Sequence, residues 1–331
     1  MIELTSIEGV RAYLEKNPIF GEETLSVEEQ NGGFTSYTYK VQTASGIFYL
    51  KHSAKHLKGA PYIDKVPEIT LYEANAYKLL SRRLSEAVLP TLVSIDANHN
   101  TLVVSNALEN VSTTLKDIIH EQRWPLTAAH EIGYHIGILH GSSLKDSEQV
   151  RYFPKYEERF YASKVAWLTS DLTFNSAVTQ HLIQEKVRAM TNEPKTLLMG
   201  DLAPRNIITD GEQVAFIDLA NATRGWPSFD IGYFAGHILL NAIEFDELSK
   251  GLAFLDTFRE GYVAGLDKND AATILKPTTI FEQAKVFAAG WMHRRTFQSY
   301  SPEDIPPDEL LAVDDYINKL IQNEQFSFVK H

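Results

Sequence analysis

The residues that could do chemistry are concentrated in segment 199–218, which reads MGDLAPRNIITDGEQVAFID. Asp201 is followed five residues later by Asn206, and Asp218 comes twelve residues after Asn206, at the end of an apolar run. Phosphoryl transfer needs these groups, because one carboxylate orients the attacking hydroxyl while an amide oxygen and a second carboxylate hold magnesium beside the phosphates. We therefore predict that Asp201 is the catalytic base and that Asn206 and Asp218 are metal ligands.

A simpler interpretation of this spacing exists. An Asp and an Asn five residues apart occur often by chance and usually form local turns through their side chains. The functional interpretation is favoured because Gly200 directly precedes Asp201 and because Asp218 closes the next apolar run. Loops beside short strands are places where a rigid scaffold can aim catalytic side chains.

Lys51 ends the apolar run Ile47–Leu50. A lysine at a strand end is commonly a solvated edge residue. In a nucleotide site, the same lysine can pair with the α- and β-phosphates if a carboxylate on a nearby helix holds it in place. Glu73 is the preferred partner, and Glu68 at the start of the same predicted helix is the alternative, since it can serve there as a cap.

Two further pairs are weaker candidates. Gly32 and Gly33 stand between two predicted strands, where they either meet the needs of a turn or expose backbone amides to phosphates. Arg294 and Arg295 lie in a predicted helix near the end of the chain, and neighbouring side chains on a helix point about 100° apart. They either face solvent or stabilise phosphate on the substrate side of the site.

The hydrophobic pattern changes character near residue 108. Before it, strand-like alternation dominates residues 24–51, 89–95 and 101–104, with helices at 4–16 and 68–84 and a loop at 52–67. After it, the pattern predicts helices at 111–120, 126–145, 155–170, 174–192, 229–243, 247–264 and 280–297, with short strands at 196–199, 206–209 and 213–217. We predict an α+β protein of two lobes: residues 1–107 form an antiparallel sheet with a helix, and residues 108–331 form a mostly helical lobe.

Composition narrows the class of protein. The chain has 331 residues and a formal net charge of −12, which argues against a general nucleic-acid binder. It has no cysteine, which excludes disulfides and fits a reducing compartment. No apolar run has the roughly 18 residues of a membrane-spanning helix, and the N-terminus does not resemble a signal peptide. We expect a cytoplasmic protein whose partner is a small molecule rather than nucleic acid or membrane, with a homodimer left open.

Together these segments resemble the aminoglycoside phosphotransferase and choline kinase group, whose members are small-molecule kinases with a protein-kinase-like fold. Residues 200–208 are similar to the group's His-Gly-Asp-x-x-x-x-Asn catalytic loop, and Phe216-Ile-Asp218 is similar to its metal-binding segment. The resemblance implies ATP and Mg²⁺ as cofactors, Lys51 and Glu73 as the phosphate-positioning pair, and a small-molecule hydroxyl as acceptor. It also implies a hinge at Ser105, Asn106 and Leu108 that offers backbone groups to adenine.

The methylthioribose kinases are the most similar subgroup. Asp218 to Gly232 keeps the spacing of their Asp-Pro-Glu-x-Ala-x-x-Gly-Pro-x-x-Phe-Asp-Ile-Gly segment without a gap, and Met292-His-Arg-Arg295 is similar to their arginine pair. Met199 stands where the group has His, and Ala220 stands where the subgroup has Glu. The alternatives are therefore a phosphotransferase of the aminoglycoside, choline or homoserine type, or a catalytically silent nucleotide-binding module.

Overall fold

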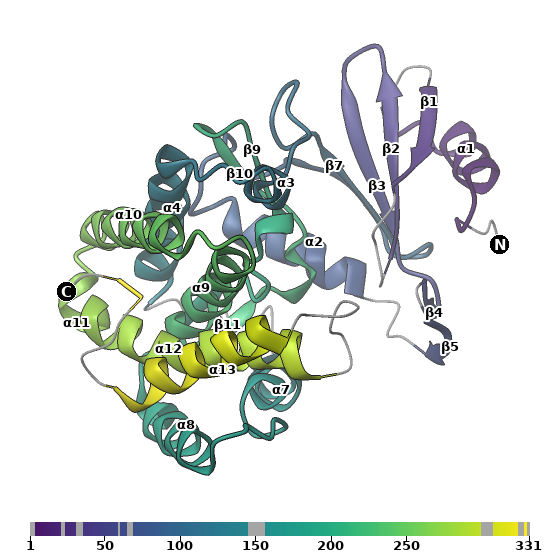
Figure 1. Ribbon diagram of the computed structural model, residues 1–331. Helices are drawn as coiled ribbons and strands as arrows, with labels where there is room; N and C mark the ends of the chain where they lie inside the picture. Colours follow the sequence, from purple (N-terminus) through teal and green to yellow (C-terminus); the bar gives the residue numbers. More distant parts are fainter. Residues whose placement is uncertain are drawn as a thin grey trace. The chain divides into compact units, whose positions relative to one another are not determined.

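Figure 1 shows the computed structural model, which describes residues 4–20, 24–30, 36–58, 60–64, 69–144, 156–298, 307–323 and 328–329. The chain divides into two units. Unit 1 comprises Met1–Asn110 together with Ala215–Ala220, and unit 2 comprises Val111–Val214 and Asn221–His331. Segment 215–220 therefore groups with residues more than a hundred positions earlier. None of the described helices is long and apolar enough to cross a membrane.

Unit 1 contains a five-stranded antiparallel sheet in the order β1-β2-β3-β7-β6. Its strands are β1 (Thr24–Glu29), β2 (Tyr37–Thr43), β3 (Ile47–His52), β6 (Leu92–Asp96) and β7 (Thr101–Ser105). β6 starts three residues later than predicted, and Pro90, which has no N–H for a ladder, stands just before it. β3 is the central strand, so Lys51 lies between Thr38 of β2 and Leu102 of β7.

Helix α1 (Ile7–Lys16) covers one part of this sheet, beside β1 in Figure 1. It begins later than the predicted residue 4, because the Ser6 side chain accepts a hydrogen bond from the N–H of Gly9 and caps the helix. Val10, Tyr13 and Leu14 recur at helical spacing and are buried. The same core cluster contains side chains from β1, β2, β3 and β7, namely Val27, Tyr39, Val41, Leu50 and Val103.

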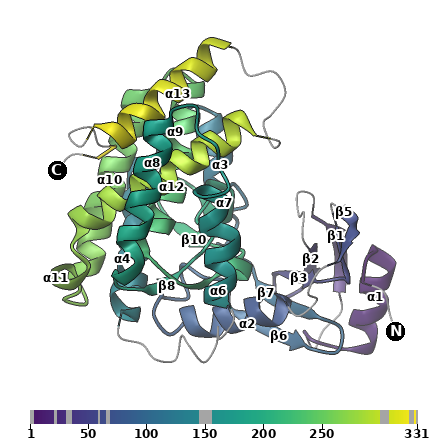
Figure 2. The same ribbon diagram turned by 90° about the horizontal axis from the view of Figure 1, so that it is seen from below.

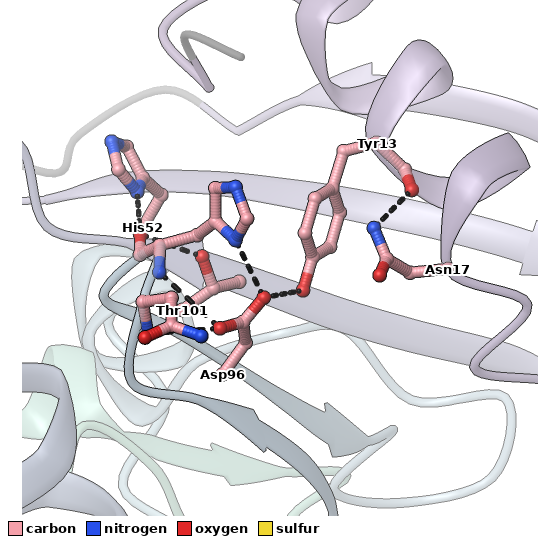
Figure 3. Close-up of polar contacts among 7 residues, drawn as sticks. Tyr13, Asn17, His52, Asp96 and Thr101 are labelled. Carbon is pink, nitrogen blue, oxygen red and sulfur yellow. Dashed lines mark hydrogen bonds and ion pairs between the residues drawn. The ribbon is translucent and has the colours of Figure 1, made fainter. Parts of the chain in front are cut away.

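A polar network also joins α1 to the turn between β6 and β7 (Figure 3). The Tyr13 hydroxyl donates to Asp96 Oδ2 over 2.9 Å, and His99 Nδ1 lies 2.7 Å from the same oxygen. Asp96 Oδ1 accepts from the N–H groups of Asn98 and His99. Burial opposes ionisation of Asp96, but the hydrogen bonds from His99 and Tyr13 outweigh it and lower the pKa of this carboxyl.

The rest of unit 1 corrects one prediction. Residues 52–67 are not all loop, because β4 (His56–Leu57) and β5 (Ala60–Asp64) pair antiparallel. Backbone pairing does not need the apolar alternation by which strands are recognised in a sequence. Helix α2 (Ile69–Leu80) follows, and Glu73 and Tyr77 lie one turn apart on its buried side.

Unit 2 is mostly helical. Its helices are α3 (Leu115–His120), α4 (Leu126–Ser143), α6 (Tyr156–Phe160), α7 (Ala166–Leu168), α8 (Ala177–Ala189), α9 (Pro227–Glu244), α10 (Leu248–Asp267), α11 (Ala272–Leu275), α12 (Pro277–Phe297) and α13 (Pro307–Gln322). Its short strands are β8 (Thr196–Leu198), β9 (Ile207–Thr209) and β11 (Thr223–Gly225). β10 (Val214–Phe216) starts in unit 2, and its last two residues belong to segment 215–220 of unit 1. β8 and β11 pair antiparallel.

Glycines let two helices of unit 2 approach closely. Figure 2 shows α10 lying alongside α4. A methyl group at Gly137 would lie 2.2 Å from the carbonyl oxygen of Tyr262, and one at Gly265 would lie 2.1 Å from the carbonyl oxygen of Tyr134. Neither position has room for a side chain, so the backbones themselves are in contact. This contact helps fix α4, whose His140 supports the candidate site described below.

Several elements of unit 2 differ from the sequence prediction. The predicted helix 155–170 is interrupted by a π-helical turn at Tyr161–Val165. The structure also contains β11, α11 and α13, which the hydrophobic pattern did not predict. α13 could have been found, since Val313, Tyr316, Ile317 and Leu320 recur at helical spacing and are all buried.

Candidate active site

Lys51, near the end of β3, forms ion pairs with two carboxylates of unit 1. Its Nζ lies 2.5 Å from Glu73 Oε1 and 3.2 Å from Asp218 Oδ1. Burial disfavours the charged amine, but the negative charges of Asp218 and Glu73 outweigh it and raise the pKa of Lys51. The lysine therefore stays protonated. The structure brings together the preferred pair, Lys51 and Glu73, whereas the alternative partner Glu68 lies outside the described residues.

Segment 215–220 is held by contacts with other residues of unit 1. The Asp218 carboxylate pairs with Lys51, which Glu73 of α2 also contacts, and the N–H of Phe216 donates to the carbonyl of Val88 over 2.9 Å. Asp218 has a positive φ of 61°, a left-handed conformation that non-glycine residues seldom adopt. These contacts explain why segment 215–220 groups with unit 1. The Asp218 side chain remains 42% exposed, so its carboxylate is open to a further ligand.

The predicted hinge residues form a tightly bonded turn after β7. Ser105 and Thr91 exchange two hydrogen bonds, from Thr91 N to Ser105 Oγ and from Ser105 N to Thr91 O, each of 2.9 Å. The N–H of Asn106 donates to the carbonyl of Ile47. The Asn106 side chain accepts from the N–H of Ala107 and donates to the carbonyl of Leu108, so the amide shapes the turn itself. Gly32 and Gly33 lie outside the described residues.

In unit 2, a buried carboxylate of α9 anchors the loop that carries Asp201. Asp230, which is fully buried, accepts hydrogen bonds from the N–H of Met199 over 2.7 Å and of Gly200 over 2.9 Å. His140 Nε2 lies 3.5 Å from the same carboxylate, and His140 Nδ1 lies 3.0 Å from the Tyr262 hydroxyl. Asp230 belongs to segment 218–232, whose spacing is similar to that of the methylthioribose kinases, but only the structure shows what it does.

Gly200 is required by the shape of this loop. Its φ is +70°, and a methyl group there would lie 1.9 Å from the carbonyl oxygen of Asn221. Neither the conformation nor the space admits a side chain. Gly200 thereby lets the chain turn sharply between β8 and Asp201, whose side chain is 7% exposed.

Asn206 lies at the end of a single 3₁₀ turn, Pro204–Asn206, and its side chain points back to the loop. Asn206 Nδ2 donates to the backbone carbonyl of Asp201 over 2.9 Å. This bond uses the amide nitrogen and leaves the amide oxygen for another partner. An amide oxygen is a suitable magnesium ligand, as is the exposed carboxylate of Asp218 in unit 1. Within the described ranges, no three His, Cys, Asp or Glu side chains cluster as a metal site of their own.

Two residues that lie beside Asp201 in the structure were not predicted from the sequence as site residues. Arg205 Nη2 lies 3.0 Å from Asp201 Oδ1 and 2.9 Å from Oδ2. Tyr233 of α9 lies beside both groups, and its pKa is raised by burial and by the charge of Asp201. The only available signal was the position of Arg205 one turn after Asp201. Nothing in the sequence indicated Tyr233.

The arginine pair of α12 separates into two environments. Arg294 donates to the backbone carbonyl of Trp167 through Nη2 over 2.7 Å, lies over the Trp167 ring at 4.8 Å, and also bonds to Gln298. Arg295 is close enough to α9 that its charge contributes to lowering the pKa of buried His237, after desolvation and the charge of Arg205. Arg294 thus packs on Trp167, whereas the charge of Arg295 reaches His237 of α9.

Comparison with known proteins identifies kinases and phosphotransferases as the relatives of this chain. Residues 26–272 match the profile of the phosphotransferase enzyme family. The chain is 26% identical to a 4-hydroxytryptamine kinase from Psilocybe cyanescens over 283 residues, which are 74% of this chain and 76% of that protein. It is 23% identical to a methylthioribose kinase from Bacillus thuringiensis subsp. konkukian over 278 residues, which are 76% of this chain and 70% of that protein.

A solved structure shares the fold. Amicoumacin kinase hAmiN, in complex with AMP-PNP, Ca²⁺ and Ami, superposes with a TM-score of 0.57 at 14% identity, covering 96% of this chain and 95% of that one. The likeness confirms the predicted protein-kinase-like class, with an antiparallel sheet in the N-terminal part and a largely helical remainder.

Proposed function

Since the chain belongs to the phosphotransferase enzyme family and is a small-molecule kinase with a hydroxyl acceptor, we propose that its phosphoryl donor is magnesium ATP and its acceptor a sugar-like alcohol such as methylthioribose. The observation that carries the proposal is the pair of anchored loops. One holds Asp218 beside the Lys51–Glu73 ion pair, and the other holds Asp201 on the buried carboxylate of Asp230.

In unit 1, Lys51 binds the α- and β-phosphates of the nucleotide. The lysine is charged, and Glu73 restrains it in one position, so it offers a fixed cation to the phosphate oxygens. The turn Ser105–Leu108 contributes the adenine contacts. Its internal hydrogen bonds hold the backbone in shape before the nucleotide arrives, which reduces the entropy lost on binding.

In unit 2, Asp201 accepts a hydrogen bond from the acceptor hydroxyl. The hydroxyl oxygen attacks the γ-phosphorus, the bond from phosphorus to the bridging oxygen of ADP breaks, and the hydroxyl proton passes to Asp201 late in the step. Because Gly200 and Asp230 fix the backbone around Asp201, the carboxylate is aimed before the reaction begins.

Magnesium is the expected cofactor. The Asn206 amide oxygen and the Asp218 carboxylate would hold it, and the bound ion would neutralise phosphate charge. Magnesium in phosphoryl-transfer sites usually takes few protein oxygens and completes its ligands with substrate phosphates and water. Support also comes from amicoumacin kinase, whose structure contains a nucleotide analogue and a divalent cation.

A second acceptor class is an aryl hydroxyl. The relative with 26% identity is a 4-hydroxytryptamine kinase, whereas the methylthioribose kinase is 23% identical. Moreover, Tyr233, beside Asp201, belongs to an aromatic cluster on α9 and α12, with the ring centroids of Tyr233 and Trp291 4.8 Å apart. Ala220, which replaces a carboxylate of the methylthioribose kinases, is a further reason to test both classes.

The test is ADP release from magnesium ATP with methylthioribose, 4-hydroxytryptamine, choline, homoserine or an aminoglycoside. We expect one hydroxyl compound to raise the rate far above that with water, and Asp201→Asn to abolish the increase while nucleotide binding, measured by calorimetry, persists. Turnover by the Asp201→Asn variant at the wild-type rate would remove Asp201 from the reaction. An ATP-binding protein that no alcohol stimulates would instead support the catalytically silent module.

A further inference from the structure

Arg205 is the one basic side chain that contacts both carboxylate oxygens of Asp201 in the part of the chain that the structure describes. A single nitrogen, Nη2, makes both contacts, at 3.0 and 2.9 Å. The Arg205 side chain is 46% exposed, whereas that of Asp201 is 7% exposed. The ion pair thus joins a buried carboxylate to a side chain that is about half exposed.

The local backbone produces this contact. Pro204 begins the 3₁₀ turn Pro204–Asn206, and its fixed φ favours the turn that carries Arg205 back over Asp201. Asn206 closes the same turn by donating to the Asp201 carbonyl. Arg205 is therefore placed by two neighbours that hold the catalytic loop, and not by a flexible surface segment.

We propose that Arg205 is a positioning residue for Asp201 in the phosphoryl transfer proposed above, on which this inference rests. It restrains the carboxylate in one orientation and offsets its negative charge beside an incoming triphosphate. An ionised carboxylate offers about four acceptor sites on its two oxygens, so the contact with Nη2 leaves room for the acceptor hydroxyl. Nε and Nη1 of Arg205 are not used in the contact with Asp201.

The pair differs from an ordinary surface ion pair in two ways. Exposed pairs four residues apart contribute little, because both side chains are solvated and mobile. Here the carboxylate is buried, and it is the group that receives the proton. Arg205 itself takes no proton during the step, because a guanidinium remains charged throughout. Its influence must act through the position and charge of Asp201.

The experiment compares Arg205→Ala and Arg205→Lys with Arg188→Ala, a matched control at an exposed position on α8 of the same unit. ADP release from magnesium ATP is measured with water and with the fastest acceptor of the panel, and melting is followed in parallel. We expect Arg205→Ala to lower kcat by about 10- to 100-fold, because small misplacements of a reacting group have effects of this size. KM for ATP should change by less than about threefold, since Arg205 is not proposed to contact the bound nucleotide in the ground state.

Added guanidinium chloride, at concentrations too low to denature, separates positioning from scaffolding. The ion should restore part of the kcat of Arg205→Ala and leave the wild type and Arg188→Ala unchanged. If Arg205→Ala does not melt cooperatively, Arg205→Lys decides, since it keeps the charge and most of the stem but cannot contact both oxygens in the same way. Its kcat should fall at an unchanged melting temperature.

The outcomes distinguish this inference from the proposed function. If Asp201→Asn abolishes turnover but both Arg205 variants keep it within about twofold, the proposed function stands and the inference is overturned. A loss in Arg205→Ala that follows the loss of melting temperature, with no guanidinium rescue and a fully active Arg205→Lys, overturns it as well. Unchanged turnover in Asp201→Asn would overturn the proposed function instead.

Discussion

Asp230 and Gly200 are joined by a hydrogen bond of 2.9 Å from the backbone N–H of Gly200 to Asp230 Oδ1. The second oxygen of the same carboxylate accepts from Met199. Both acceptors are therefore used, and the Asp230 side chain has no exposed surface. The residue before Asp201 is thus fixed to α9, which explains how a loop can present a carboxylate in one place.

Asp230→Asn should slow turnover by about 100-fold, because one of the two N–H groups would face an amide NH₂ and the loop would shift. Since a buried donor would lose its charged acceptor, we also expect a loss of about 2 kcal/mol in the free energy of unfolding. Steady-state kinetics and urea unfolding measure the two effects. Wild-type kcat in a correctly folded variant would show that the anchor is dispensable.

The Lys51–Glu73 pair should behave as a unit. Lys51→Met and Glu73→Gln are each expected to lower kcat/KM for ATP by about 100-fold, and the double variant should be little worse than either one, because each change disrupts the same arrangement. Lys58 and Glu29 form a matched ion pair of 2.6 Å in the same unit, and the corresponding Lys58→Met and Glu29→Gln changes should leave turnover unaltered. Additive losses at Lys51 and Glu73 would contradict a shared role.

Substitutions of the two arginines of α12, Arg294 and Arg295, should have different effects. Arg294→Ala removes the bonds to Trp167 and the contact with its ring, so we expect a loss of about 2 kcal/mol in stability. Arg295→Ala is expected to slow turnover, because the charge of Arg295 acts near His237, one turn from Tyr233. The reverse pattern, with Arg294→Ala stable and inactive, would place Arg294 in the substrate site.

The network of Tyr13, Asp96 and His99 should make the free energy of unfolding depend on pH (Figure 3). The folded pKa of Asp96 lies below its ordinary value of 3.8, so its contribution is present above about pH 4 and is lost as the pH falls through the folded pKa. Asp96→Asn should therefore destabilise the protein by about 1 kcal/mol at pH 7, and the difference from the wild type should shrink below about pH 4.

Chemical unfolding at pH 7, 5 and 3 measures this effect. Asp267→Asn, at an exposed position at the end of α10, is the control and should show no such pH dependence. Tyr13→Phe should lose a similar amount at pH 7, because it removes the donor and keeps the ring. If the difference between Asp96→Asn and the wild type instead grows as the pH falls, the pKa of Asp96 is raised by folding rather than lowered.

The reaction class and the main elements could be predicted from the amino-acid sequence alone. The spacing of Asp201, Asn206 and Asp218 indicated phosphoryl transfer, since that chemistry requires particular groups in a particular order along two short loops. Helices such as α4, α9 and α10 were predicted because an amphipathic or apolar period is a local property of the chain. Local patterns say nothing, however, about which distant side chains meet.

Only the tertiary structure shows which side chains far apart in the sequence contact one another. Segment 215–220 groups with unit 1, where Asp218 pairs with Lys51 and the N–H of Phe216 bonds to the carbonyl of Val88. Asp230 anchors the loop that carries Asp201, and Arg205 and Tyr233 lie beside Asp201. The contacts at Asp201 depend on the packing of α9 and on the left-handed conformation of Gly200. Residues that are far apart in the chain but close in space produce no periodic pattern in the sequence, so these contacts could not be predicted from it.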